Sequence, residues 1–126
     1  MLPLRLAWLW ATIGWLGVAF AVFLTVLPTT ASPVPVGGPA QHIAGYFILT
    51  LWFLGLYPRG HYPWIGLAVL AFGGLMELAQ LLSPTRHPAL ADAARNGIGI
   101  GAAVALAYAG LGGWAQRVER WLRVAR

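Results

Sequence analysis

The stretch LAWLWATIGWLGVAFAVFLTVL, from Leu6 to Leu27, decides the class of fold that this chain can adopt. It contains 22 residues and no charged side chain. At a rise of about 1.5 Å per residue, a helix of this length crosses a hydrocarbon core of about 30 Å. The run is also longer than the apolar part of a signal peptide, which has about 7–15 residues. We therefore expect a first membrane-spanning helix that is retained in the mature protein.

The whole chain has the composition of an integral membrane protein. Of its 126 residues, 60% are hydrophobic and 9% are charged, against roughly 25% charged residues in ordinary soluble domains. This length predicts one domain over residues 1–126. The net charge of +5 comes from arginines at the ends of apolar runs, without a basic patch interleaved with aromatic residues. We therefore expect no nucleic-acid partner.

Proline and glycine divide the apolar sequence into four segments. The stretch PTTASPVPVGG after the first segment is too rich in proline and glycine for a helix, Pro58 closes the second, and SPTRHP separates the third from the fourth. The expected spans are residues 6–27, 39–57, 64–82 and 88–111, followed by a tail at 112–126. Segments that cross lipid satisfy their backbone hydrogen bonds as helices. The sequence therefore predicts an all-α integral membrane bundle of four helices.

The arginines predict the orientation of this bundle. With both termini in the cytoplasm, six arginines lie on the inner side and only Arg86 and Arg95 on the outer side, where Asp92 partly offsets them. The opposite orientation would violate the positive-inside rule. Four tryptophans near the inner boundary are then expected to form an interfacial belt: Trp8, Trp10, Trp64 and Trp114.

The C-terminal tail, WAQRVERWLRVAR, combines apolar residues at helical spacing with arginines on the opposite face. This pattern predicts an amphipathic helix in the inner interface, beside anionic headgroups. A frayed basic tail that only sets the topology is an equal alternative. Neither form implies catalysis.

Polar residues gather at the outer end of the predicted bundle. His42 and Tyr46 share one face of the second span, and Glu77 lies near the outer end of the third. Asp92 falls in the first turn of the fourth span, near the positive end of its helix dipole. The candidate catalytic residues are His42, Glu77 and Asp92, and the candidate substrate-binding residues are Tyr46, Gln80, Arg86, Arg95 and Asn96.

Small residues accompany these polar groups. Gly73 precedes Glu77 by one turn, Gly99 continues the Asn96 face, and Gly97 and Gly101 are four residues apart. Because small residues allow membrane helices to approach closely, we expect the polar faces to be packing faces as well.

The Glu77 carboxylate is expected to face the bundle, with Arg86 or Arg95 as its partner, because exposure to lipid would cost several kcal/mol. A buried ion pair that only fixes the register of the helices is an equal alternative. A histidine and two carboxylates also suit zinc or manganese. Here, however, they come from three separate helices without compact ligand spacing. We therefore expect no metal and no cofactor.

The ordered polar motifs resemble the VanZ-like family of small bacterial membrane proteins over nearly the whole chain. They are QHIAGYF and ELAQLLSPTRHPALADAARNGIGIG, which place a histidine before a tyrosine, then E-x-x-Q, an arginine, an aspartate and N-x-x-G. The family often has an Asp-Lys pair where this chain has Gly38 and Pro39. The resemblance implies a four-helix protein in the bacterial cytoplasmic membrane, and the family's namesake is associated with teicoplanin resistance.

Three classes of function follow. The polar residues can form a site that binds or acts on a lipid or envelope-precursor headgroup, with arginines holding an anion and the carboxylates and histidine moving protons. This would affect susceptibility to glycopeptide antibiotics. The alternative is a non-catalytic accessory protein whose buried polar residues only fix helix packing, with membrane lipids or a membrane protein as partners. A proton path is disfavoured because the polar residues stop in the outer third. The sequence leaves open whether the protein is an enzyme.

Overall fold

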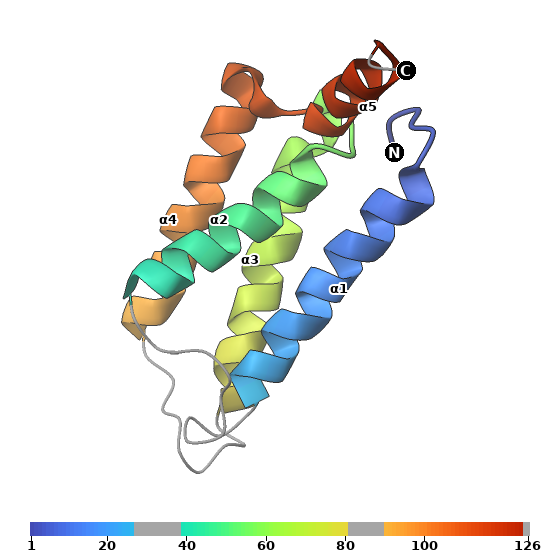
Figure 1. The fold of residues 1–126 in the computed structure, drawn as a ribbon. Coiled ribbons are helices and arrows are strands. Elements are labelled where there is room, and N and C mark those ends of the chain that lie inside the picture. Colours follow the sequence, from blue (N-terminus) through green and yellow to red (C-terminus); the bar gives the residue numbers. More distant parts are fainter. Residues whose placement is uncertain (27–38, 81–89, 125–126) are drawn as a thin grey trace.

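The computed structural model describes residues 1–26, 39–80 and 90–124, and these ranges are built from helices joined by short turns (Figure 1). The α-helices are α1 (Ala7–Val26), α2 (Pro39–Leu54), α3 (Tyr62–Ala79), α4 (Leu90–Leu106) and α5 (Trp114–Val124). A 3₁₀ turn, Arg59–His61, precedes α3, and a π-helical turn, Ala107–Leu111, follows α4. The all-α prediction is therefore confirmed for the described residues.

Two of these helical segments are long and apolar enough to cross a membrane, namely Ala7–Thr25 and Arg59–Ala79. A third is obtained if α4, its π-helical turn and α5 are taken together as one span, although the two parts are bent by 44°. The α2 helix is apolar but has only 16 residues. Length and composition thus support two or three spans among the described residues.

The α2 helix ends at Leu54, three residues before the predicted end at residue 57. Its last carbonyl groups are taken by the start of α5: the Trp114 indole donates to the Leu51 carbonyl at 2.9 Å, and the Gly113 amide donates to that of Leu54 at 3.1 Å. Gly55 lies against the Trp114 indole, where any side chain would collide. At this end of α2 the amides of Gly55 and Leu56 still donate to carbonyls of the last turn, and α5 supplies the further donors.

The α3 helix begins at Tyr62, two residues before the predicted start. The loop PRGHYP, predicted as a tight turn, contains the 3₁₀ turn that leads into this helix. Other predicted span ends lie outside the described residues, at positions 27, 81–82 and 88–89.

The closest helix contact joins α2 and α4. At Gly99 of α4, an added Cβ would collide with the Ile43 carbonyl oxygen and lie 3.1 Å from the Phe47 amide nitrogen. Gly99 therefore lets the two backbones touch, as predicted for a small residue on a packing face. Gly97 and Gly101 differ from that prediction, because a Cβ on either would meet nothing within 4 Å. They lie to one side of the contact.

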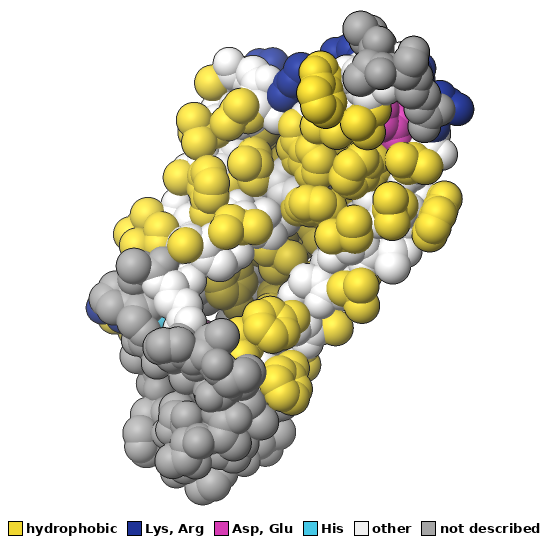
Figure 2. All heavy atoms as spheres, viewed as in Figure 1, with side chains coloured by type: hydrophobic (Ala, Val, Ile, Leu, Met, Phe, Trp, Pro, Cys, Tyr) yellow, Lys and Arg dark blue, Asp and Glu magenta, His cyan; other side chains and the backbone are white. Residues whose placement is uncertain are grey.

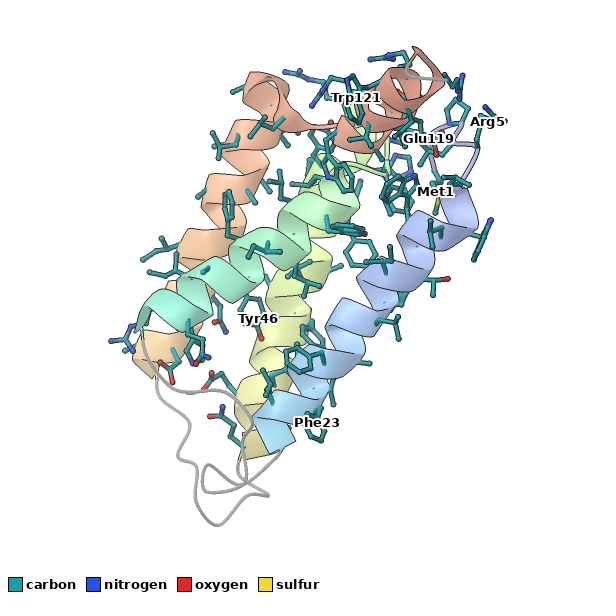
Figure 3. The ribbon with its side chains drawn as sticks, in the orientation of Figure 1. Met1, Arg5, Phe23, Tyr46, Glu119 and Trp121 are labelled. Carbon is teal, nitrogen blue, oxygen red and sulfur yellow. The ribbon has the colours of Figure 1, made fainter. Side chains whose placement is uncertain are left out.

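Both chain ends lie at the same end of the molecule, where Glu119 of α5 joins α5 to α1 (Figures 1 and 3). The Glu119 carboxylate is buried and accepts hydrogen bonds from the backbone amides of Arg5 and Leu6, at 2.7 and 2.8 Å. The Trp10 indole donates to the same carboxylate at 2.8 Å. Because the first amides of a helix have no partner within it, Glu119 caps the start of α1 from a distant part of the chain.

Three tryptophans pack beside this cap. Trp114 lies 4.7 Å from Trp52 and 5.5 Å from Trp10, measured between ring centroids. Trp10 and Trp114 were expected to be belt residues, but they hold α1, α2 and α5 together. Trp8 and Trp64 are 69% and 71% exposed, as a residue in an interfacial belt would be.

The tail forms a packed helix through Val124, so the alternative of a frayed tail is wrong for the described residues. Gly110 and Gly113, with φ of 133° and 68°, make the bend that turns α5 away from α4. These backbone angles favour glycine because a Cβ would clash with the backbone. Ala115 and Glu119 lie on the buried face of α5, whereas Trp121 is exposed.

We predict that Gly99→Ala lowers the free energy of unfolding in detergent by about 1–3 kcal/mol, the usual cost of overpacking. The added methyl group would force α2 and α4 apart, because its nearest neighbours are backbone atoms that cannot rotate away. Gly101→Ala is the matched control and should leave stability unchanged or slightly raised. Equal effects of the two substitutions would contradict the assignment of Gly99 as the close contact.

We also predict that Glu119 makes stability depend on pH. Burial alone raises the pKa of its carboxyl, but the amides of Arg5 and Leu6, the Trp10 indole and nearby Arg123 together hold that pKa below its ordinary value of 4.5. A carboxyl with a lowered pKa stabilises the fold above its ordinary pKa, and this contribution is lost as the pH falls through the folded-state value.

The measurement is the thermal stability of the wild-type protein and of Glu119→Gln between pH 7 and pH 3. The wild type should be several degrees more stable at pH 7, and the difference should shrink at the acidic end. A difference that stays constant over this range would show that the charge of Glu119 contributes nothing.

Candidate site between three helix ends

At the end of the molecule opposite the termini, the starts of α2 and α4 lie beside the last turns of α3 (Figure 1). His42 is in the first turn of α2, Asp92 is in the first turn of α4, and Glu77 is close to the end of α3. One imidazole nitrogen of His42 and one carboxylate oxygen each of Glu77 and Asp92 all lie within 4.8 Å of one another. The structure thus brings together the three residues chosen from the sequence as candidate catalytic groups.

Asn96 positions the ring of His42. Its side-chain oxygen lies 3.0 Å from His42 Nδ1, and Asn96 itself is only 2% exposed. An amide oxygen can only accept a hydrogen bond, so Nδ1 carries the proton and donates it. In the neutral ring, Nε2 is then left with its lone pair. This bond depends on the α2–α4 contact, because Gly99 lies one turn further along the same face of α4 as Asn96.

Asp92 lies between His42 and Arg95. Its Oδ1 accepts from the Arg95 guanidinium at 2.8 Å, and its Oδ2 lies 3.8 Å from His42 Nε2. The second distance is too long for a hydrogen bond. Arg95 therefore pairs with the acid on its own helix, whereas we expected it or Arg86 to pair with Glu77. Arg86 lies outside the described residues, so its part of that prediction stays untested.

Tyr46 points from α2 towards α3 (Figure 3). Its ring packs against Phe72 with centroids 6.3 Å apart, and a Cβ on Gly73 would lie 3.2 Å from that ring. Tyr46 thus borders the group of three, with Gly73 providing the room for its ring. Gln80, another candidate binding residue, is buried directly after the last residue of α3.

The sequence did not indicate the importance of Glu119, at the other end of the molecule. A cavity of about 130 Å³ lies there, lined by Arg5, Leu6, Glu119, Leu122 and Arg123. The tail was expected to form an amphipathic helix beside anionic headgroups or a frayed basic end, and neither expectation gave a role to the one acid among its four arginines. That isolated acid was the available signal, because an acid on a basic helix needs donors of its own.

We predict that His42 and Asn96 are energetically coupled. A double-mutant cycle of His42→Ala and Asn96→Ala should give a coupling of about 1 kcal/mol in the free energy of unfolding, the usual net value of one buried hydrogen bond. The same cycle with His42→Ala and Gln116→Ala, a residue of α5 at the opposite end, should be additive. Additivity in both cycles would show that the bond contributes nothing to stability.

Comparison with protein-family models, with curated proteins and with solved structures found no match to this chain.

Proposed function

We propose that this chain is a multi-pass protein of the bacterial cytoplasmic membrane, of the VanZ-like family, whose polar site binds or acts on a phosphate-bearing lipid or envelope-precursor headgroup. The family is proposed from the ordered motifs around His42, Glu77, Asp92 and Asn96. Support comes from the way these motifs, which are far apart in the sequence, meet between three helix ends.

The proposed topology has four spans and both termini in the cytoplasm. The helices α1 to α4 all run between the same two ends of the molecule, which supports α2 and α4 as spans despite their modest length (Figure 1). In Figure 2, dark blue side chains gather over the end with the termini and α5, and yellow apolar side chains cover the flank below them. An arginine-rich end beyond an apolar flank matches the inner side of a membrane protein. The polar site then lies at the outer face.

One observation carries the proposal of a functional site rather than a packing contact: two carboxylates, Glu77 and Asp92, have oxygens within 4.8 Å of each other. Like charges this close repel, although the Arg95 guanidinium beside Asp92 reduces the repulsion. A contact that served only to fix helix packing would not need two acids so close together. Ionisable groups inside a membrane protein that face each other in this way are typical of a site for chemistry or binding.

The groups around the carboxylates suit a phosphate headgroup. The Arg95 side chain is 34% exposed, and its Nη1 donates to Asp92. Other N–H groups of the guanidinium can bind an anion. His42 and the two carboxylates lie within reach of the same place and can transfer protons. The lipid chains of such a ligand would lie against the apolar flank of the bundle.

We predict that His42→Ala, Glu77→Gln and Asp92→Asn each reduce binding of a phosphate-bearing lipid at least tenfold while the protein still folds. The measurement is mass spectrometry of lipids that co-purify with each variant, together with teicoplanin susceptibility of cells that express it. His61→Ala is the matched control, because His61 is an exposed histidine at the opposite end. It should behave like the wild type in both assays.

The competing role in packing predicts another result. If the three substitutions reduce the amount of folded protein, and if apolar replacements of similar volume restore it without any change in co-purified lipid, the residues serve packing alone.

A further inference from the structure

His42, Glu77 and Asp92 offer the kinds of atom that divalent metal ions bind in proteins. They supply one imidazole nitrogen and two carboxylate oxygens, from three different helices, within 4.8 Å of one another. This mixture of nitrogen and oxygen ligands suits Zn²⁺ or Mn²⁺. From the sequence alone we expected no metal site, because the three residues show no compact ligand spacing. The fold removes that objection, since α2, α3 and α4 bring the three side chains together.

The distance between the ligand atoms of His42 and Asp92 fits a shared ion better than a direct hydrogen bond. With bonds of about 2.0–2.2 Å to zinc, two ligands of a tetrahedral site lie about 3.4 Å apart. The Nε2 of His42 and the Oδ2 of Asp92 are separated by 3.8 Å, too far for a hydrogen bond and close to the separation of two ligands. An ion could be bound with side-chain movements of well under an ångström for this pair.

The surroundings of His42 prepare it as a ligand. Because the buried Asn96 oxygen accepts from Nδ1 at 3.0 Å, the lone pair of the neutral ring is on Nε2, the nitrogen that faces Asp92. Histidine ligands in metal sites almost always donate their other ring N–H in this way, which fixes the tautomer and the ring orientation.

The two carboxylate oxygens of Asp92 have different neighbours, and this arrangement also prepares Asp92 as a ligand. Arg95 occupies Oδ1 at 2.8 Å, and Oδ2 is directed at the histidine. A hydrogen-bonded carboxylate of this kind is held in one orientation, which lowers the cost of ordering it around an ion. Both ligands therefore have a supporting partner on α4.

The charges of the side chains favour binding of a divalent cation. The two carboxylates carry a formal charge of −2, which the Arg95 guanidinium beside Asp92 offsets in part, and a divalent cation between them would attract both. Three protein ligands leave at least one coordination position open for water or for a phosphate oxygen.

We propose that His42, Glu77 and Asp92 bind one divalent transition-metal ion, with Asn96 as the positioning residue for the histidine. The ion would lie in the proposed headgroup site. Only the identity of the ligand that the ion contacts besides the protein rests on the proposed function.

The test uses the full-length protein in detergent, freed of its purification tag, incubated with Zn²⁺ or with Mn²⁺ and passed through a desalting column. Elemental analysis by mass spectrometry should find about one ion per chain for the wild type and for His61→Ala. His42→Ala and Asp92→Asn should retain less than a tenth of that amount. Asn96→Ala should weaken metal affinity by about 10–100-fold in a competition with a chelating dye, as loss of a supporting partner does.

Failure to retain either metal in the wild type would overturn the proposal, and so would equal retention by His42→Ala and the wild type when both are folded by circular dichroism. Lipid co-purification, repeated after treatment with a chelator, separates the two proposals. Metal retained without any bound headgroup lipid contradicts the proposed function alone. A wild type that binds its lipid but retains neither metal contradicts the metal site alone.

Discussion

The close approach of α2 and α4 at Gly99 is the contact on which the rest of the structure depends. Without a side chain at this position, the α4 backbone touches the carbonyl of Ile43 and the amide of Phe47. One turn away, that proximity brings Asn96 within hydrogen-bond distance of His42 and sets Asp92 opposite the other side of the same ring. A small residue that contributes no functional group thus determines the geometry of the polar cluster.

Burying polar groups in an apolar protein costs free energy, and the two ends of the molecule differ in how their buried acids are arranged. At the end with the termini, the Glu119 carboxylate accepts from two backbone amides and an indole, so one charge satisfies several donors. At the opposite end, the carboxylates of Glu77 and Asp92 lie close to each other. The first arrangement stabilises a helix start, whereas the second brings two acids together beside the Arg95 guanidinium, which reduces their repulsion.

The helical class and most helix positions could be predicted, because an apolar run of about 20 residues has few structures open to it in lipid. The end of α2 could not be predicted. The next residue, Gly55, lies against the indole of Trp114, which is 59 positions further along the chain. That His42, Glu77 and Asp92 would lie together was also predictable, since helix ends on one side of a bundle must meet. Its internal pairing was not: Arg95 was expected beside Glu77 but bonds to Asp92 on its own helix.

By itself, the sequence determined that the chain is an apolar α-helical protein with six of its eight arginines segregated from a small group of polar residues. It could do so because hydropathy and charge act along the chain and need no knowledge of contacts. Only the tertiary structure decided which atoms face each other: that His42 presents Nε2 to Asp92, that Gly99 and not Gly97 or Gly101 makes the close contact, and that Glu119 caps α1. The physical reason is that hydrogen bonds and close packing act over a few ångströms. The crossing of the helices sets such distances, and no local pattern of residues specifies them.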